Sequence, residues 1–114
     1  MGDLSAHFSL SEFRDRSTGH VLRPPAQLLT VLERIRELRP GPLRIVSGHR
    51  CCEHNAAVGG ADQSRHIYGD AADIPAGRAT VAEAAAAGAV GIGESDGWAI
   101  HVDVRPGGPA RWSY

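Results

Sequence analysis

The sequence has no lysine, few aromatic residues and no surplus of charge of either sign. Its formal net charge is −1, so it lacks the basic excess that would attract nucleic acid or an anionic membrane, and we expect neither as a partner. No apolar run approaches the roughly 20 residues of a membrane-spanning helix. The first residues also lack a basic stretch followed by an apolar core, which is the pattern of a signal peptide.

Cysteine is equally scarce, because Cys51 and Cys52 are the only two. They are adjacent, and a bridge between neighbours is strained and closes almost no loop. The sequence therefore has no disulfide framework, and its cysteines do not indicate a redox compartment.

What is present indicates one folded domain, residues 1–114, of the α+β class. The length is that of a single domain, and the apolar content of 42% is typical of globular proteins. Hydrophobic periodicity, capping pairs and turn residues predict the elements. In the first half of the chain we expect a short helix from Ser9 with Glu12 in its capping box, a helix between Pro24-Pro25 and Pro40-Gly41-Pro42, and a strand over 43–47. A loop over 48–64 follows, with one helical turn near 55–58. The second half is expected to contain a strand over 70–74, an alanine-rich helix from Thr80 to Gly88, strands over 89–93 and 98–104 with a turn at 95–97, and a C-terminal loop with aromatic anchors.

Two histidines and an aspartate occupy positions that suit a metal site. His101 lies inside the last predicted strand, where alternation puts it on one face with Ala99 and Asp103. Asp73 stands in an apolar stretch, where a carboxylate is costly unless its charge is paired or bound to a cation. His66 precedes it by seven residues, and a glycine turn between them would let both side chains reach one ion.

Two imidazoles and a carboxylate suit zinc, and a fourth position left for water is typical of catalytic rather than structural sites. The same set also holds Fe(II). The spacing alone leaves an alternative open, in which Asp73 caps a turn and His101 is merely half-buried. Surface or hydrogen-bonding roles fit the remaining histidines, which are His7, His20, His49 and His54.

A compound motif extends this pattern. It consists of S-G-H-R at 47–50, N-A-A-V-G-G at 55–60, S-R-H-I-Y-G-D-A-A-D at 64–73 and H-V-D at 101–103. In order and spacing, and over nearly its whole length, the chain resembles the zinc D-Ala-D-Ala peptidases, a group that also contains lysostaphin-type enzymes and the hedgehog signalling domain. The resemblance implies a small, mostly antiparallel central sheet flanked by helices, with a zinc site in a cleft on the sheet.

The resemblance also implies a role for individual residues that match the motif of the family. The resemblance implies that His66, Asp73 and His101 are the zinc ligands. It implies that Arg50 faces the substrate and stabilises the negative charge that develops on its carbonyl oxygen, and that Ser64 lies beside the metal and helps to hold the peptide. The alternatives are a structural hydrogen bond from Arg50 and a turn hydroxyl at Ser64.

The general base is where the sequence departs from the relatives. Several of them have a glutamate three residues before the last histidine or a histidine two before it, whereas here these positions are Trp98 and Ala99, which cannot transfer a proton. Three carboxylates remain, at Glu94, Asp96 and Asp103. We assign Glu94 as the base and Asp103 as a partner that orients a ligand. The alternatives are a solvated turn residue at Glu94 and the base itself at Asp103.

The resemblance implies a hydrolase, namely a zinc metallopeptidase that cuts peptidoglycan stem peptides as a D-Ala-D-Ala carboxypeptidase or as an endopeptidase, and we expect a monomer. Without a signal peptide it resembles a phage lysis enzyme that reaches the cell wall by a separate route, or a domain excised from an exported protein. One alternative is a hedgehog-like, zinc-containing binding module without catalysis. Another is an iron oxygenase, although such enzymes usually place the carboxylate two residues after the first histidine.

Overall fold

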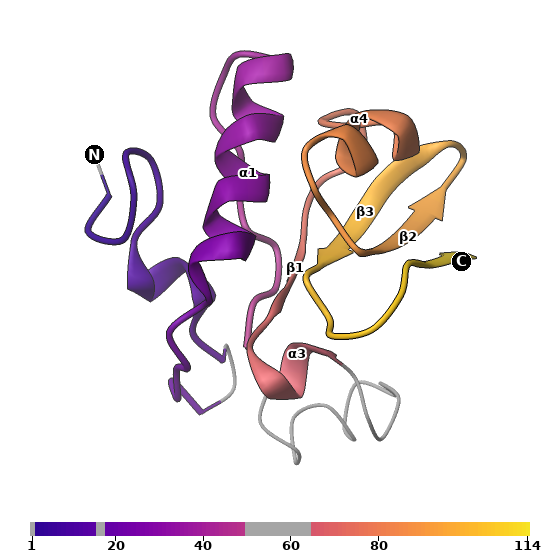
Figure 1. Cartoon of the computed structure of the whole chain (residues 1–114). Coiled ribbons are helices and arrows are strands. Elements are labelled where there is room, and N and C mark those ends of the chain that lie inside the picture. The colour runs from indigo at the N-terminus through magenta and orange to yellow at the C-terminus, as the bar shows by residue number, and fades with distance from the viewer. Residues whose placement is uncertain (1, 16–17, 50–64) are drawn as a thin grey trace.

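The computed structural model describes residues 2–15, 18–49 and 65–114, and its element order confirms the α+β class. Figure 1 shows helices packed beside a sheet, which is four-stranded and mixed. In the described part of the chain, no helix combines the length and the apolar character needed to cross a membrane. The elements are η1 (Leu10–Phe13), α1 (Ala26–Leu38), α3 (Arg65–Tyr68), β1 (Ala71–Asp73), α4 (Val81–Ala86), β2 (Gly91–Ser95), β3 (Trp98–Asp103) and β4 (Ala110–Ser113).

The predicted helix boundaries are confirmed where local chemistry defines them. Pro25 caps α1, because its fixed φ suits the first turn and its missing N–H costs no hydrogen bond there. At the short η1, the backbone N–H of Ser9 donates to Oε2 of Glu12 at 2.6 Å. At α4, Thr80 Oγ1 accepts from the backbone N–H of Glu83 at 3.1 Å, and the Thr80 N–H donates to the Glu83 carboxylate.

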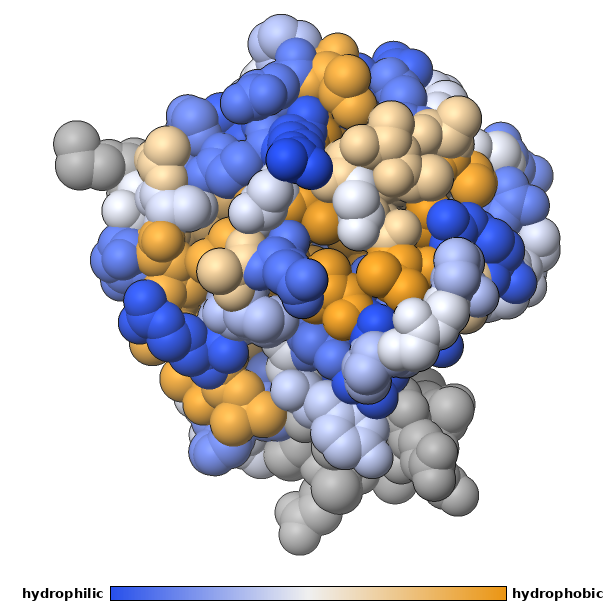
Figure 2. Space-filling model, viewed as in Figure 1, coloured by the Kyte–Doolittle hydropathy of each residue, from blue (hydrophilic) through white to orange (hydrophobic). Residues whose placement is uncertain are grey.

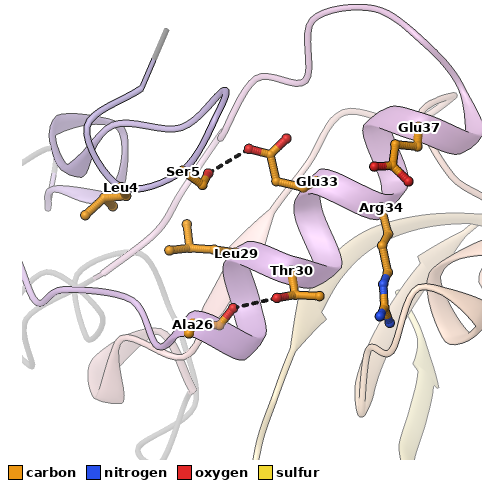
Figure 3. Close-up of a pocket in the computed structure, with 8 residues that line it drawn as sticks. All are labelled: Leu4, Ser5, Ala26, Leu29, Thr30, Glu33, Arg34 and Glu37. Carbon is orange, nitrogen blue, oxygen red and sulfur yellow. Dashed lines mark hydrogen bonds between the residues drawn. The ribbon is translucent and has the colours of Figure 1, made fainter.

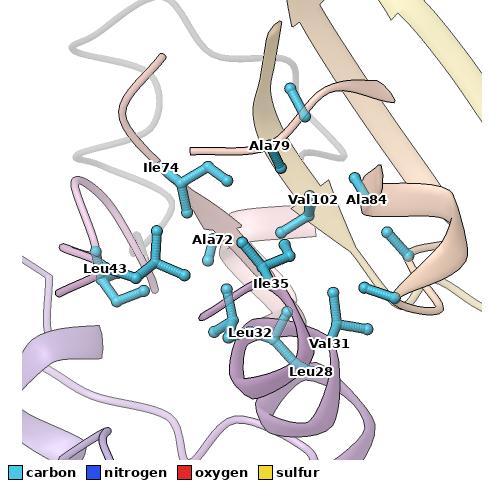
Figure 4. Packing of buried hydrophobic residues seen from close by; sticks show 14 of the residues in the cluster. Leu28, Val31, Leu32, Ile35, Leu43, Ala72, Ile74, Ala79, Ala84 and Val102 are labelled. Atoms are coloured by element: carbon cyan, nitrogen blue, oxygen red, sulfur yellow. The ribbon is translucent and has the colours of Figure 1, made fainter. Parts of the chain in front are cut away.

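The core lies between α1 and one face of the sheet, with α4 closing one end. Leu28, Leu32 and Ile35 project from α1 towards Ala72 of β1 and Val102 of β3 (Figure 4). All five side chains are fully buried. Burying apolar area of this kind is the main favourable contribution to folding, about 25 cal/mol per Å².

The sheet has the order β1-β3-β2-β4, with antiparallel β1/β3 and β2/β3 pairs and a parallel β2/β4 pair. The strand β4 corrects the sequence-based prediction of a C-terminal loop. This segment of four residues is too short and too weakly patterned for a strand to be predicted from sequence. It forms a strand because it pairs with an edge of β2 that is otherwise open. The segment thereby brings Trp112 opposite Gly93.

The predicted strand over 43–47 is also wrong, because this segment makes only one isolated bridge, Ser47 with Asp73. Two hydrogen bonds hold it, from Val46 N to Asp73 O at 2.9 Å and from Asp73 N to Ser47 O at 2.8 Å. Side-chain burial of Leu43 and Ile45, rather than a ladder, anchors the segment. The helical turn expected near 55–58 lies outside the described residues, whereas α3 is a helical turn that the sequence did not predict.

A β-bulge in β3 decides which side chains share a face. Gly93 pairs with His101 but Glu94 pairs with Ala99, so Ile100 is an extra residue without a partner in β2. Ala99 consequently belongs to the core, like Val102 three residues later. The expectation that Ala99 shares a face with His101 is therefore wrong, since regular alternation ends at the bulge.

Candidate metal centre

One row of paired residues crosses the sheet on the face opposite the core. Asp73 of β1 pairs with His101 of β3, His101 with Gly93 of β2, and Gly93 with Trp112 of β4. The neighbouring row contains Ala72, Val102 and Ile92, which lie in the core. Because successive residues of a strand point to opposite faces, the row of Asp73 and His101 points away from the core.

His66 joins this row from α3. Gly69, with φ at +80°, reverses the chain between α3 and β1, a conformation that favours glycine. His66, Asp73 and His101 each offer one ligand atom, and these three atoms lie within 4.8 Å of one another. We call these three residues the His–Asp–His trio. The side chain of Asp73 is 29% exposed, so solvent reaches the trio from its side.

A single carboxylate oxygen faces one nitrogen of each imidazole. Oδ1 of Asp73 lies 3.1 Å from Nε2 of His66 and 3.2 Å from Nδ1 of His101. The two imidazole rings meet edge to face, with centroids 5.0 Å apart. The ligand set that the sequence predicted is thus brought to one point by three separate elements.

The outer nitrogens of both imidazoles are held by acceptors. Nδ1 of His66 lies 2.7 Å from the carbonyl oxygen of Gly48, which can only accept, so this nitrogen has the proton. Nε2 of His101 lies 2.8 Å from Oδ2 of Asp103 and donates to that carboxylate. In the neutral rings the inner nitrogens then present lone pairs towards Asp73. Three such acceptors converge favourably only around a proton or a cation, and fixing the outer nitrogen is how proteins orient metal-binding histidines.

Electrostatics in the trio follow from burial and hydrogen bonding. Burial alone would raise the pKa of the Asp73 carboxyl, but hydrogen bonds with His101 and His66 outweigh it and hold that pKa well below its usual range. Burial would lower the pKa of His101, but its bonds to Asp103 and Asp73 raise it. These bonds favour a proton on His101, and a divalent cation bound at the trio would displace it.

Asp103 is a fully buried anion with a complete set of donors. Its Oδ1 accepts from the backbone N–H groups of Gly91 and Arg105, each at 3.1 Å, and the guanidinium of Arg105 donates to both oxygens, from Nε at 2.9 Å and Nη2 at 2.7 Å. Burial would raise the pKa of Asp103, but the bonds with His101 and Arg105 keep it below its usual range. The contact with His101 is what the predicted orienting role requires.

Glu94, the predicted base, lies elsewhere. It follows Gly93 on β2 and pairs with Ala99, whose side chain is in the core, so its register places it on the other face from His101. Its Oε1 accepts from the hydroxyl of Ser113 at 2.8 Å. The structure therefore does not bring Glu94 to the trio.

The other predicted site residues divide into two groups. Asp96 is exposed, and together with Gly97 it forms the two-residue turn between β2 and β3, both with positive φ. Arg50 and Ser64 lie outside the described residues, so their predicted roles stay predictions.

Two residues that sequence reasoning did not assign to the site, Trp112 and His49, also contact the trio, and a third, Arg105, contacts its neighbours. The ring centroid of Trp112 lies 5.0 Å from that of His101, and Arg105 reaches both Trp112 and Asp103. His49 is buried, and its Nδ1 lies 3.2 Å from the carbonyl oxygen of His66. Only weak sequence signals pointed to Trp112, an aromatic residue in the expected C-terminal loop, and to Arg105, which lies two residues after the H-V-D motif.

A surface groove of about 420 Å³ runs along α1 (Figure 3). Ser5 and Glu33 are hydrogen-bonded at its wall, 2.7 Å apart. None of its lining residues belongs to the trio or contacts it through a hydrogen bond described above. On the face drawn in Figure 2, apolar residues gather in the middle and hydrophilic residues lie mainly around them.

Comparison with known proteins gives one family. A family model described as Peptidase M15 matches residues 6–103, a span that includes the whole trio and Asp103. Among curated proteins, none matches the sequence.

Proposed function

Because this chain belongs to the Peptidase M15 family, we propose that it is a zinc-dependent peptidase that hydrolyses the stem peptides of bacterial peptidoglycan. The observation that supports the proposal best is the convergence of Nε2 of His66 and Nδ1 of His101 on one oxygen of Asp73, with both outer nitrogens already hydrogen-bonded. Such a set of two histidines and a carboxylate is complete for a three-ligand catalytic zinc site.

The donor set fits zinc. His66, Asp73 and His101 would hold the ion, and the partly exposed side of Asp73 leaves access for water and substrate. Bound zinc lowers the pKa of a coordinated water and polarises the scissile carbonyl group. Gly48 and Asp103 keep the two imidazoles in the tautomers that present their inner nitrogens. Arg50 would stabilise negative charge on the substrate carbonyl, and Ser64 would help to hold the peptide.

The substrate class rests on the family and on the compound motif. Carboxypeptidase action on a terminal D-Ala-D-Ala bond and endopeptidase action on a crosslink both fit a site that opens to solvent at Asp73. We propose that the chain acts as a monomer, since the trio is built from elements of one chain.

A second candidate is a zinc-containing binding module with weak or no catalysis. One observation favours it. Two of the three carboxylates considered as base have other partners: Glu94 is bonded to Ser113 on the other face, and Asp103 is buried and fully occupied by donors. Neither is well placed to accept a proton from water at the trio.

Metal analysis and cleavage assays separate these functions. Protein purified without added metal is analysed for zinc and iron and then incubated with purified peptidoglycan and with a D-Ala-D-Ala peptide. One zinc per chain together with cleavage supports the peptidase. Zinc without cleavage of either substrate favours the binding module, iron would support an oxygenase, and failure to bind any divalent metal would overturn the proposal.

A further inference from the structure

Arg105 contacts two groups that touch His101 from different directions. Its guanidinium donates to the Asp103 carboxylate, which accepts from Nε2 of His101, and its Cζ lies 5.1 Å from the ring centroid of Trp112, which packs against the His101 ring. We propose that Arg105 is a positioning residue that fixes the orientation and tautomer of His101 through Asp103 and Trp112. The inference rests on the metal site of the proposed function.

The first route runs through Asp103. The guanidinium binds the carboxylate with its planar fork, Nε to Oδ1 at 2.9 Å and Nη2 to Oδ2 at 2.7 Å, which fixes the plane of the carboxylate. The Gly91 N–H binds Oδ1 from the neighbouring strand, and a Cβ at Gly91 would overlap the carboxylate. Oδ2 therefore stays aimed at Nε2 of His101, and Nδ1 stays aimed at Asp73.

The second route runs through Trp112. Its ring lies over Gly93, where an added Cβ would come within 2.7 Å of the indole Nε1, so the absence of a side chain admits the ring. The ring is tilted by 56° to the imidazole of His101 at a centroid distance of 5.0 Å. The cation of Arg105 lies over the same indole and is attracted to its π face, which holds the ring in place.

Loss of the guanidinium would weaken both the contact with Asp103 and the contact with Trp112, which each restrain His101. The buried Asp103 carboxylate would lose its two-bond partner and gain freedom to rotate, and Trp112 would lose the cation on its face. His101 could then present either nitrogen towards Asp73. Outer residues of this kind typically change metal affinity 10- to 100-fold when they are replaced.

The variants are Arg105→Gln and Arg105→Lys, with Arg111→Gln as the matched control. Lysine keeps the charge but has no planar fork, so it separates charge from geometry. Arg111 is an exposed arginine of β4 that donates to the carbonyl oxygens of Val90 and Ala110 and does not contact Asp103 or Trp112 through any interaction described above.

Two measurements test the inference, each on the full chain. Chelator competition gives the zinc affinity, for which we expect roughly a 10- to 100-fold loss in Arg105→Gln, a smaller loss in Arg105→Lys and no change in Arg111→Gln. Nitrogen-15 NMR of the metal-free protein at alkaline pH, where the imidazole is neutral, gives the His101 tautomer. We expect the Nε2–H form in the wild type and a mixture in Arg105→Gln.

The outcomes distinguish this inference from the proposed function. Wild-type zinc affinity and an unchanged His101 tautomer in Arg105→Gln would overturn the role of Arg105, even if the protein cleaves peptidoglycan. A wild-type protein that binds no zinc would overturn the proposed function, while the tautomer measurement would still decide on Arg105. If Arg105→Gln does not fold, the same two readouts on Arg105→Lys decide, because that variant retains the charge next to Asp103.

Discussion

Asp73 and His101 are direct partners across β1 and β3, although 28 positions separate them in the sequence, and Oδ1 of Asp73 lies 3.2 Å from Nδ1 of His101. Strand pairing fixes this relationship, since a slip of one residue would turn either side chain to the opposite face. His66 reaches the same oxygen from α3, the helical turn that precedes β1. The metal centre therefore depends on the β1/β3 register.

We expect His101→Ala to abolish zinc retention and peptidase activity together, because it removes a ligand that no neighbour on β3 can replace. Elemental analysis after gel filtration measures the zinc, and thermal unfolding with and without added zinc measures its linkage to folding. A ligand that binds only the folded state, at 100 times its dissociation constant, stabilises by about 2.7 kcal/mol, and this gain should vanish in the variant.

The control for His101→Ala is His7→Ala. His7 is exposed and bonds Glu33 on α1 at 2.6 Å, and it should leave zinc binding intact. Full zinc retention in His101→Ala would remove this histidine from the ligand set.

Glu94→Gln separates the sequence-based role of Glu94 from its observed position. The sequence-based assignment of Glu94 as the base predicts a loss of turnover of about 100-fold or more. Its register and its bond to Ser113 instead lead us to expect zinc retention and a turnover within a few-fold of the wild type. Steady-state cleavage of a D-Ala-D-Ala peptide distinguishes the two expectations. A turnover reduced by two orders of magnitude would show that Glu94 is the general base.

Gly91→Ala should destabilise the fold and weaken zinc binding, since its methyl group would overlap the Asp103 carboxylate. Crowding of this kind in a packed interior typically costs about 1–3 kcal/mol. Urea unfolding measures the free energy of unfolding, and chelator competition measures the zinc affinity. Gly108→Ala is the matched control, because nothing lies within 4 Å of its added methyl and its φ is not positive. Equal stability of the two variants would contradict the close approach of Gly91 and Asp103.

We expect Glu33 to contribute to the loss of stability of the folded protein at acidic pH. Burial would raise its pKa, but hydrogen bonds from Ser5 and His7 outweigh it and lower the pKa below the ordinary value of 4.5. Because the folded-state pKa is the lower one, the ionised carboxylate stabilises the protein above about pH 4.5, and this stabilisation is lost as the pH falls through the folded-state pKa.

Glu33→Gln should therefore lower stability at neutral pH and flatten the acid limb of a stability–pH curve measured by urea unfolding. Glu37→Gln, at an exposed position of the same helix, should change neither. An unchanged acid limb in Glu33→Gln would show that Ser5 and His7 do not favour its ionised form.

Local chemistry made much of the fold predictable. Pro25 and Arg39 are the N-cap and C-cap of α1, next to the prolines that precede and follow its apolar pattern. Thr80 and Glu83 form the capping box of α4. Asp96 and Gly97 make the hairpin turn that their types favour. Each of these features depends on residues a few positions apart, so a short stretch of sequence contains both interacting partners.

Pairing between strands that are distant in the sequence determined the features that sequence reasoning missed. The segment over 43–47 has the pattern of a strand, but Ser47 finds only one bridging partner in β1, whereas the unpatterned β4 gains a full edge of β2. The bulge at Ile100 likewise depends on pairing with β2, and it separates Ala99 from His101 and leaves Glu94 on the core side. No window of sequence contains these partners, because each lies on another strand.

By itself, the sequence determined the helix caps and the hairpin, since caps and turns are properties of neighbouring residues, and its compound motif predicted the His–Asp–His trio. Only the tertiary structure decided that Arg105 and Trp112 surround His101 and that Glu94 points away from it. The physical reason is that a strand presents its side chains on alternate faces, so register and one extra residue determine which of them meet at the metal centre.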